Sequence, residues 1–293
     1  LENAIDSKAT KISLVIVDSG RTLIQVIDNG LGMSKNDALL CFSRHATSKI
    51  QKTDELFSLN TKGFRGEALS SIASISHVEL NTKLEKEELG SKLIIEGNEL
   101  KENLDIANQK GTNIKVKNLF YNVPARRNFL KSNAVESKHI ITEFQRIVLA
   151  HPEIYFTMHH NNSIVFDLPK CLLRQRIINV FGKRYNTRLV PVEEETIITS
   201  ISGYILKPEF AKRTRGEQYI FVNNLQGIVK PRLFTCDAKS QISFIIDVPP
   251  PLDKAVPSTL PLKKEYVSFI CLVISEVNFK KEEERSSPLR DTS

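Results

Sequence analysis

A short glycine-containing segment offers the first chemistry in this sequence of 293 residues. Its residues are Asp28–Asn29–Gly30–Leu31–Gly32–Met33. The Asp28 carboxylate can accept a hydrogen bond from an exocyclic amine, and glycines without a Cβ let a ligand approach the backbone closely. The same pattern fits a tight turn that binds nothing. Taken alone, the segment leaves a ligand site and a plain turn as alternatives.

A second segment, Gly63–Phe64–Arg65–Gly66–Glu67–Ala68–Leu69, runs into a helix predicted at 66–75. Unpaired backbone N–H groups at a helix start attract anions. Upstream, Arg44–His45–Ala46–Thr47–Ser48–Lys49 supplies hydroxyls and cations able to close over phosphates. A solvated basic loop is the alternative interpretation of these residues.

Two further positions could complete such a site. Thr112 follows Gly111 at the start of a predicted strand, and its hydroxyl can line a ligand. Asn3 offers a neutral carbonyl oxygen, a ligand type that Mg²⁺ accepts. Each residue by itself is equally consistent with an ordinary surface or turn position.

The elements that must position these residues follow from hydrophobic periodicity and turn residues. A capping box predicts that Ser34 opens a helix over 34–42, with Asp37 at its third position. The chain start, Leu1–Asp6, resembles the inside of a helix, so we expect the chain to begin within an element. The remaining predictions are strands at 12–17, 22–28, 78–84, 92–96, 113–120, 154–158, 163–168, 196–206 and 218–223, and helices at 134–150 and 172–181.

Composition excludes several classes of protein. Apolar residues make up 41% of the chain and charged residues 26%, the balance of a soluble globular protein. The longest apolar run, Val267–Ile274, is far shorter than a membrane span, and we expect no signal peptide, because no basic segment followed by an apolar stretch stands at the start of the given sequence. The four cysteines lack zinc-ligand spacing, and we expect them to be reduced. The motifs of P-loop nucleotide sites, G-x-S-x-G hydrolases and H-E-x-x-H metalloproteases are absent from the sequence.

Positive charge is concentrated in one part of the chain. Between Lys170 and Arg232 there are 12 Lys/Arg against 5 Asp/Glu, an excess equal to the net charge of +7 for the whole chain. This localisation favours a phosphate-rich partner such as DNA, and Lys212, Arg213 and Arg215 are the residues expected to contact it. A solvated basic face without a partner remains the alternative.

Taken in order, Asn3, DNGLGM, RHATSK, GFRGEAL and GTNIKVKNLFYNVPARRNFL resemble the MutL family of DNA mismatch-repair proteins. The wider motifs are shared with gyrase, histidine kinases and the ninety-kilodalton chaperones, whereas RHATSK, GFRGEAL and LFYNVPARRNFL are typical of the MutL branch. The resemblance extends from Leu1 to about Asn224. It implies an α+β fold, a two-layer α/β sandwich with a mixed sheet under helices, followed by a smaller β-α-β domain.

The resemblance also implies residue roles with ATP and Mg²⁺ as cofactors. Asp28 would hold the adenine amine, Thr112 would line the adenine side, and Asn3 would ligate magnesium. Gly30, Gly32 and Met33 would shape the pocket. The lid and phosphate cradle would comprise Thr47, Ser48, Lys49, Gly63, Phe64, Arg65, Gly66, Glu67, Ala68 and Leu69.

The sequence departs from the family pattern at three places. The family's general base is a Glu four residues before the magnesium Asn, a position upstream of Leu1, so we expect this polypeptide alone not to hydrolyse ATP at a meaningful rate. The HPxK segment has no counterpart after His160, and nothing selects Lys254, Lys263 or Lys264 as a substitute. Leu225 follows Phe221–Val222–Asn223–Asn224 where the family has a basic residue.

These observations lead to one interpretation and one alternative. The chain is predicted to be the ATP-binding part of a mismatch-repair protein that couples mismatch recognition to strand incision. The alternative is a non-hydrolysing DNA-binding or scaffold segment of that family, and a gyrase-type subunit is disfavoured by LFYNVPARRNFL. The expected domains are residues 1–175 for ATP, 176–248 facing DNA and divergent after 224, and a Pro-rich linker with a charged tail over 249–293.

The expected partners also follow from the resemblance. They are DNA with little sequence preference, a mismatch-recognition protein of the MutS family, and a second MutL-family subunit in a homo- or heterodimer. No membrane partner is expected. The expected location is cytoplasmic in a bacterium and nuclear in a eukaryote.

Overall fold

The structure is a computed structural model that describes residues 1–43, 66–195, 199–210, 219–221 and 273–279. The chain divides into two compact units, Leu1–Asn186 and Thr187–Ser293. The division falls after helix α6 (Leu173–Phe181), whereas the predicted boundary at 175/176 lies inside that helix. Among the described residues, no helix is long and apolar enough to cross a membrane.

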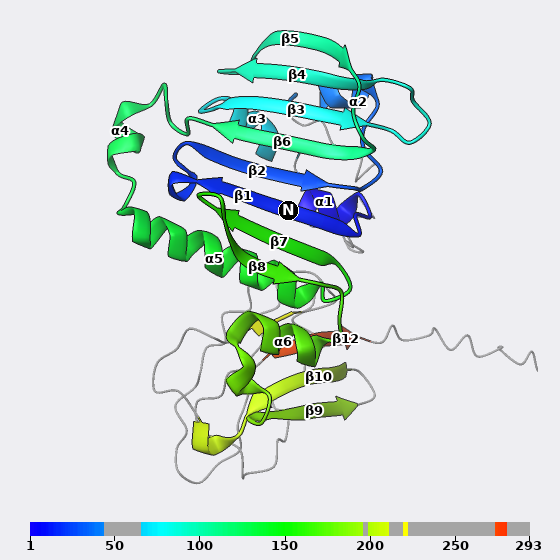
Figure 1. The fold of residues 1–293 in the computed structure, drawn as a ribbon, viewed down its shortest axis with the longest axis vertical. Coiled ribbons are helices and arrows are strands. Elements are labelled where there is room, and N and C mark those ends of the chain that lie inside the picture. The colour runs from blue at the N-terminus through cyan, green and yellow to red at the C-terminus, as the bar shows by residue number, and fades with distance from the viewer. Residues whose placement is uncertain (44–65, 196–198, 211–218, 222–272, 280–293) are drawn as a thin grey trace, which may run out of the picture. The chain divides into compact units, whose positions relative to one another are not determined.

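The first unit is built on a mixed eight-stranded sheet in the order β5-β4-β3-β6-β2-β1-β7-β8 (Figure 1). Strands β1 and β7 run parallel, and the other neighbouring pairs are antiparallel. The strands are β1 (Lys11–Val17), β2 (Leu23–Asp28), β3 (His77–Lys83), β4 (Gly90–Glu96), β5 (Glu99–Ile106), β6 (Gly111–Lys117), β7 (Tyr155–His160) and β8 (Ser163–Leu168). This mixed sheet confirms the predicted α+β class.

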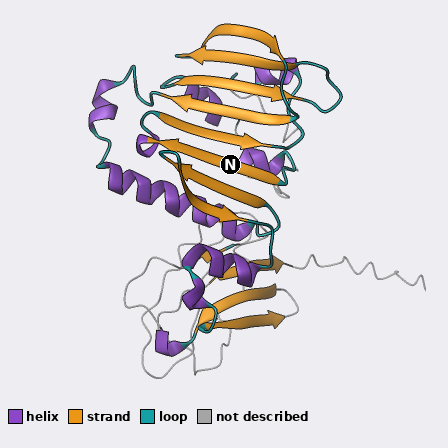
Figure 2. Cartoon of the chain, viewed as in Figure 1, coloured by secondary structure: helices purple, strands orange, loops and turns teal. Residues whose placement is uncertain are grey.

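Helices cover one face of this sheet and leave the other face open, as the ribbon views show (Figures 1 and 2). The helices of this unit are α1 (Glu2–Asp6), α2 (Lys35–Leu40), α3 (Ala68–Ala73), α4 (Pro124–Asn128), which lies beside the sheet, α5 (Asn133–Ala150) and α6, with short 3-10 turns η1 (Asp18–Gly20) and η3 (Lys183–Tyr185). Ser34 caps α2 as predicted, because its hydroxyl accepts a hydrogen bond from the Asp37 N–H at 3.2 Å.

The core lies between the sheet and the helices. Alternate strand residues are buried on the covered face, which is why β1 shows Ile12, Leu14 and Ile16 at 4% exposure or less. Phe144 of α5 packs edge-on against Phe156 of β7, with ring centroids 6.1 Å apart. The other fully buried side chains of this core include Val78, Leu80, Leu93, Leu149, Leu168 and Ile177.

The open face carries a three-residue ion network at its centre. Glu79 of β3 accepts hydrogen bonds from Lys115 and Lys117 of β6, each at 2.8 Å. Burial alone raises the pKa of Glu79, but the two lysines outweigh that effect and lower the pKa from 4.5 to about 2. The carboxylate therefore stays ionised at a pH where an exposed glutamate is protonated.

Replacing Glu79 by Gln should lower the free energy of unfolding by about 1 kcal/mol at neutral pH, because water screens the partly exposed lysines. A carboxyl whose pKa is depressed on folding stabilises the protein above its unfolded pKa, and this stabilisation is lost as the pH falls toward the folded pKa. The difference between wild type and variant should thus shrink between pH 4.5 and about pH 2. Urea unfolding across this range measures it. Glu85→Gln, at the exposed pair with Lys110, is the control and should leave stability unchanged, because water screens this pair.

A fully buried arginine fastens α6 to the sheet. Arg176 is 0% exposed and donates to the carbonyl oxygens of Leu168 at 3.1 Å, Pro152 at 2.9 Å and Ile154 at 2.6 Å. Its guanidinium also lies 5.7 Å from the ring centroid of Phe156. Desolvation by burial lowers its pKa from the ordinary value. Arg176 was counted among the cations for a phosphate-rich partner, and its burial removes it from that set.

In the second unit, the described residues form a four-stranded sheet in the order β11-β12-β10-β9. Its elements are β9 (Leu189–Glu195), β10 (Thr199–Leu206), η4 (Pro208–Phe210), β11 (Tyr219–Ile220) and β12 (Val273–Phe279). β12 pairs antiparallel with β10 and parallel with β11. The region predicted as linker and tail, 249–293, thus contains a strand, β12. The prolines at 249–261 and the tail from 280 lie outside the described residues.

Candidate functional site

The site begins with a row of polar side chains on the covered face of the sheet. Asp28 of β2 pairs with Thr112 of β6, and Thr112 pairs with Thr82 of β3. Residues paired in register share one face, so these three side chains lie in one row. Thr82 is 0% exposed and Thr112 8%, whereas their covered-face neighbours on the same strands, such as Leu80, are apolar. A buried polar row among apolar rows indicates a binding site or a structural network.

Backbone donors fix the orientation of Asp28. The Gly30 N–H donates to its Oδ1 at 2.9 Å. Burial raises the pKa of Asp28 above its ordinary value, while hydrogen bonds from the backbone of Gly30, the backbone of Thr112 and the side chain of Ser7 act in the opposite direction. These donors hold the carboxylate as an oriented acceptor at the end of β2. An acceptor of this kind suits an amine of a ligand.

The glycines around Asp28 are required by close backbone contacts. A Cβ on Gly30 would lie 2.0 Å from the Ser7 hydroxyl oxygen, and one on Gly32 would lie 2.0 Å from the Lys83 carbonyl oxygen. A Cβ on Gly111 would lie 2.1 Å from the carbonyl oxygen of Asp28 itself. Gly32 and Gly111 also have positive φ, +76° and +114°. The plain turn that the sequence left open is thus a turn packed against both α1 and β3.

The Met33 backbone is hydrogen-bonded to this row. Its N–H donates to the Thr82 hydroxyl at 2.9 Å, which holds the chain between Gly32 and α2 against β3. The Thr82 oxygen also lies 3.1 Å from the Gly111 carbonyl oxygen and 3.2 Å from the Thr112 hydroxyl. The loop after β2 and the start of β6 therefore share one buried hydroxyl.

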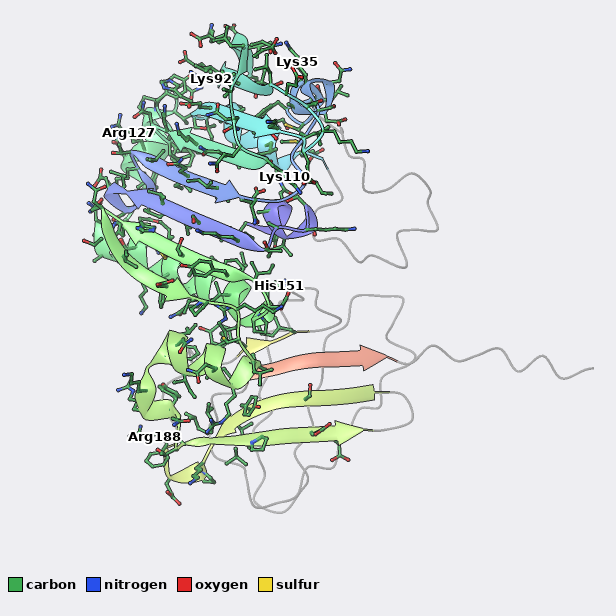
Figure 3. The ribbon with its side chains drawn as sticks, turned by 45° about the vertical axis from the view of Figure 1, so that its right-hand side comes forward. Lys35, Lys92, Lys110, Arg127, His151 and Arg188 are labelled. Atoms are coloured by element: carbon green, nitrogen blue, oxygen red, sulfur yellow. The ribbon has the colours of Figure 1, made fainter. Side chains whose placement is uncertain are left out.

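The elements next to the row supply the remaining described candidates. Asn3 lies on α1 with an exposed side chain, and Ser7 at the end of α1 accepts a backbone hydrogen bond from Leu31 at 2.9 Å. Lys110 lies beside Gly111, where β6 begins (Figure 3). The opposite end of β6 leads to Arg127 of α4. The site is therefore at the edge formed by the end of β2 and the beginning of β6.

Part of the predicted phosphate cradle is described. Gly66 adopts a φ of +63° before α3, Glu67 is exposed at the start of that helix, and the Glu67 carbonyl oxygen accepts from the Ser70 hydroxyl at 2.9 Å. Ala68 and Leu69 form the first turn of α3. Thr47, Ser48, Lys49, Gly63, Phe64 and Arg65, and the predicted DNA contacts Lys212, Arg213 and Arg215, lie outside the described residues.

Two residues of this site escaped prediction from sequence. Thr82 lies in a strand with ordinary alternation, and Ser7 ends a short helix, so neither has a local motif. Only the strand register, which brings Thr82 next to Thr112, reveals the first of them. Gly111 precedes Thr112 in the sequence, but its contact with Asp28 depends on the pairing of β2 with β6.

Two family models match parts of this chain. Residues 1–122 match the family of histidine kinase-, DNA gyrase B- and HSP90-like ATPases. Residues 177–233 match the family described as DNA mismatch repair protein, C-terminal domain. The fold and the first match define the class of this protein, an ATPase domain of the gyrase and histidine-kinase type.

Named relatives carry the assignment further. DNA mismatch repair protein MutL of Christiangramia forsetii is 59% identical over 224 residues, which cover 76% of this chain and 36% of that protein. MutL of Flavobacterium johnsoniae is 56% identical over 224 residues, covering 76% and 35%. The chain thus spans about a third of the length of these relatives.

Solved structures show the same likeness. The Aquifex aeolicus MutL ATPase domain complexed with ADP has a TM-score of 0.57 at 26% identity, and the match covers 76% of this chain and 78% of that one. The N-terminal domain of a DNA repair protein has a TM-score of 0.64 at 25% identity, covering 76% and 71%. This chain belongs to the MutL family of DNA mismatch-repair proteins and corresponds to their amino-terminal region.

Proposed function

We propose that this chain binds ATP with Mg²⁺ at the Asp28 site and uses the nucleotide as a switch in DNA mismatch repair. The observation that carries the proposal is Asp28 itself. Its carboxylate is oriented by backbone donors at a strand end, and the glycines around it leave no room for side chains. An oriented acceptor beside closely approachable backbone suits the exocyclic amine and flat face of adenine.

Magnesium fits the residue proposed to hold it. Mg²⁺ keeps several waters and takes only one or two protein ligands when substrate phosphates complete its shell. Asn3 presents an exposed neutral oxygen on α1, next to the Ser7 end of the site. Among the described residues, no cluster of three His, Cys, Asp or Glu side chains offers an alternative metal site. When bound, the ion would neutralise phosphate charge, while Asn3 would orient it.

The switch would act through the chain segments that contact nucleotide. Thr47, Ser48, Lys49 and the segment from Gly63 to Leu69 are proposed to close over the phosphates. The conformational change would couple mismatch recognition by a MutS-family protein to strand incision, within a dimer of MutL-family subunits. Lys212, Arg213 and Arg215 are proposed to contact the DNA backbone with little sequence preference. Catalysis in this class depends on positioning and on electrostatic stabilisation of phosphates.

The proposed function is tested by replacing Asp28 with Asn. The amide keeps the shape but loses the charge, and its NH₂ group cannot accept from the adenine amine. A hydrogen bond to a charged group contributes about 1.5–3 kcal/mol, so the dissociation constant for a non-hydrolysable ATP analogue should rise roughly 10- to 100-fold. Isothermal titration calorimetry with Mg²⁺ measures this change.

The matched control is Asp105→Asn, which removes an exposed carboxylate paired with Lys35 at 2.6 Å. It should leave nucleotide affinity unchanged. Equal affinity of wild type and Asp28→Asn for the analogue would remove Asp28 from the site. No measurable binding by the wild-type chain would reject nucleotide binding altogether.

A further inference from the structure

Thr82 is buried where a bound base would not contact it, yet its hydroxyl joins two segments that form the site. It is 0% exposed, and its hydroxyl connects the loop after β2 to the start of β6. Three groups approach its oxygen: the Met33 N–H at 2.9 Å, the Gly111 carbonyl oxygen at 3.1 Å and the Thr112 hydroxyl at 3.2 Å. Two of these neighbours flank Asp28 in the site.

The chemistry of the three neighbours determines where each proton lies. A backbone N–H can only donate, so Met33 uses one lone pair of Thr82. A carbonyl oxygen can only accept, so the single hydroxyl proton of Thr82 goes to Gly111. The remaining contact is then satisfied only if Thr112 donates its own proton to Thr82. One arrangement of protons satisfies all three contacts.

This arrangement makes Thr112 an acceptor toward the site. The Thr112 hydroxyl donates its proton to Thr82, so only the lone pairs of its oxygen remain available to a ligand. Asp28, the next residue in the same row, is also an acceptor. Two acceptors side by side attract the two protons of an exocyclic amine and repel a carbonyl oxygen.

We propose that Thr82 is a positioning residue that makes the site select a 6-amino purine over a 6-oxo purine by fixing the Thr112 hydroxyl as an acceptor. This inference rests on the proposed nucleotide function and adds the origin of its base specificity. Without the Thr82 hydroxyl, Thr112 can rotate and donate to a 6-oxo group. Discrimination then depends on Asp28 alone.

The test compares imido analogues of ATP and ITP, two nucleotides that differ in the base at position 6 and in the N1 proton. Their affinities are measured by calorimetry with Mg²⁺ for the full chain carrying Thr82→Val, Thr82→Ser or Thr157→Val. Valine matches threonine in shape but lacks the hydroxyl, and serine restores it. Thr157→Val is the matched control, because Thr157 is buried in the same sheet and donates to Ser13 at 2.8 Å on the open face.

Wild type should prefer the ATP analogue, and Thr82→Val should reduce the ATP-to-ITP preference roughly 3- to 10-fold, the effect of one neutral hydrogen bond. Thr82→Ser and Thr157→Val should keep the wild-type preference. An unchanged preference in folded Thr82→Val, or an equal loss in Thr157→Val, overturns the positioning role while nucleotide binding stands. Binding of neither analogue by wild type overturns the proposed function instead.

Loss of the Met33 hydrogen bond also destabilises Thr82→Val, so its melting temperature is recorded first. If it is unfolded at the assay temperature, Thr112→Val replaces it in the comparison. This variant removes the acceptor but leaves the Thr82 bonds to Met33 and Gly111 intact. The preference for the ATP analogue should again fall, and an unchanged preference overturns the proposal.

Discussion

Gly32→Ala is expected to abolish measurable nucleotide binding and to lower the free energy of unfolding by about 2–5 kcal/mol. The new Cβ would lie 2.0 Å from the Lys83 carbonyl oxygen and 2.7 Å from its carbonyl carbon. These are backbone atoms of β3, so they cannot swing away as a flexible side chain does. Alanine also resists the φ of +76° at this position.

The effect on binding follows from what lies next to Gly32. Met33 donates to Thr82, and Lys83 follows Thr82 in β3, so separating the two backbones breaks that hydrogen bond. The backbone displaced at Gly32 would also move Gly30, whose N–H orients the Asp28 carboxylate. This displacement of the loop, which the loss of one hydrogen bond alone would not cause, is expected to abolish binding. Calorimetry with a non-hydrolysable ATP analogue and urea unfolding measure the two effects.

Gly182→Ala separates backbone strain from steric overlap. Gly182 ends α6 with a φ of +104°, and nothing lies within 4 Å of a Cβ placed there. This variant should lose about 1–3 kcal/mol through strain alone and should bind the nucleotide like wild type. If Gly32→Ala binds as tightly as Gly182→Ala, the close approach of the two backbones is not needed for the site.

The parts of the site that could be predicted from sequence are those whose residues are adjacent in the chain. Asp28, Gly30 and Gly32 stand within five positions, and their types alone suggest an acceptor beside open backbone. Ser34 with Asp37 gave the start of α2 for the same reason, because a capping box is a local motif. The turn between β7 and β8 has a local signal too, because Asn161 and Asn162 are residues that tolerate positive φ and adopt 47° and 66°.

The parts that escaped prediction depend on strand register. Thr82 becomes part of the site only because β3 pairs with β6 and β6 with β2, and a shift of one residue would turn its side chain to the open face. Strand β5 was missed for another reason. It is an edge strand that is exposed over most of its length, and Glu102 interrupts the apolar series Leu100, Leu104 and Ile106.

The distribution of charge along the sequence shows where cations are concentrated, but not what each cation contacts in the fold. The excess of cations between Lys170 and Arg232 includes Arg176, whose guanidinium is buried and bound to backbone carbonyls. Arg174 donates to the Asn186 carbonyl oxygen at 2.6 Å, and Arg188 lies 4.3 Å from the ring centroid of Phe210. A count of charges cannot distinguish an arginine that holds the fold from one that faces a partner.

The buried arginine leads to the second large expected effect. Arg176→Met should lower the free energy of unfolding by about 3–5 kcal/mol, measured by urea unfolding followed by circular dichroism at neutral pH. Methionine fills much of the volume but donates nothing, so the carbonyl oxygens of Pro152, Ile154 and Leu168 lose a buried donor. Each buried acceptor left unsatisfied costs about 1–3 kcal/mol, and the removal of a buried charge offsets part of that cost.

Arg176→Lys distinguishes the loss of the charge from the loss of its geometry. Lysine keeps the positive charge, but its single ammonium cannot match a planar guanidinium whose Nη1 donates to Leu168 and whose Nη2 donates to Pro152 and Ile154. The lysine variant should therefore be less stable than wild type and more stable than the methionine variant. A methionine variant within about 1 kcal/mol of wild type would mean that water or backbone movement satisfies the three carbonyls. Arg176 would then be a buried cation without a structural role, and α6 would be held by the packing of its buried apolar residues, which include Ile177, Ile178 and Val180.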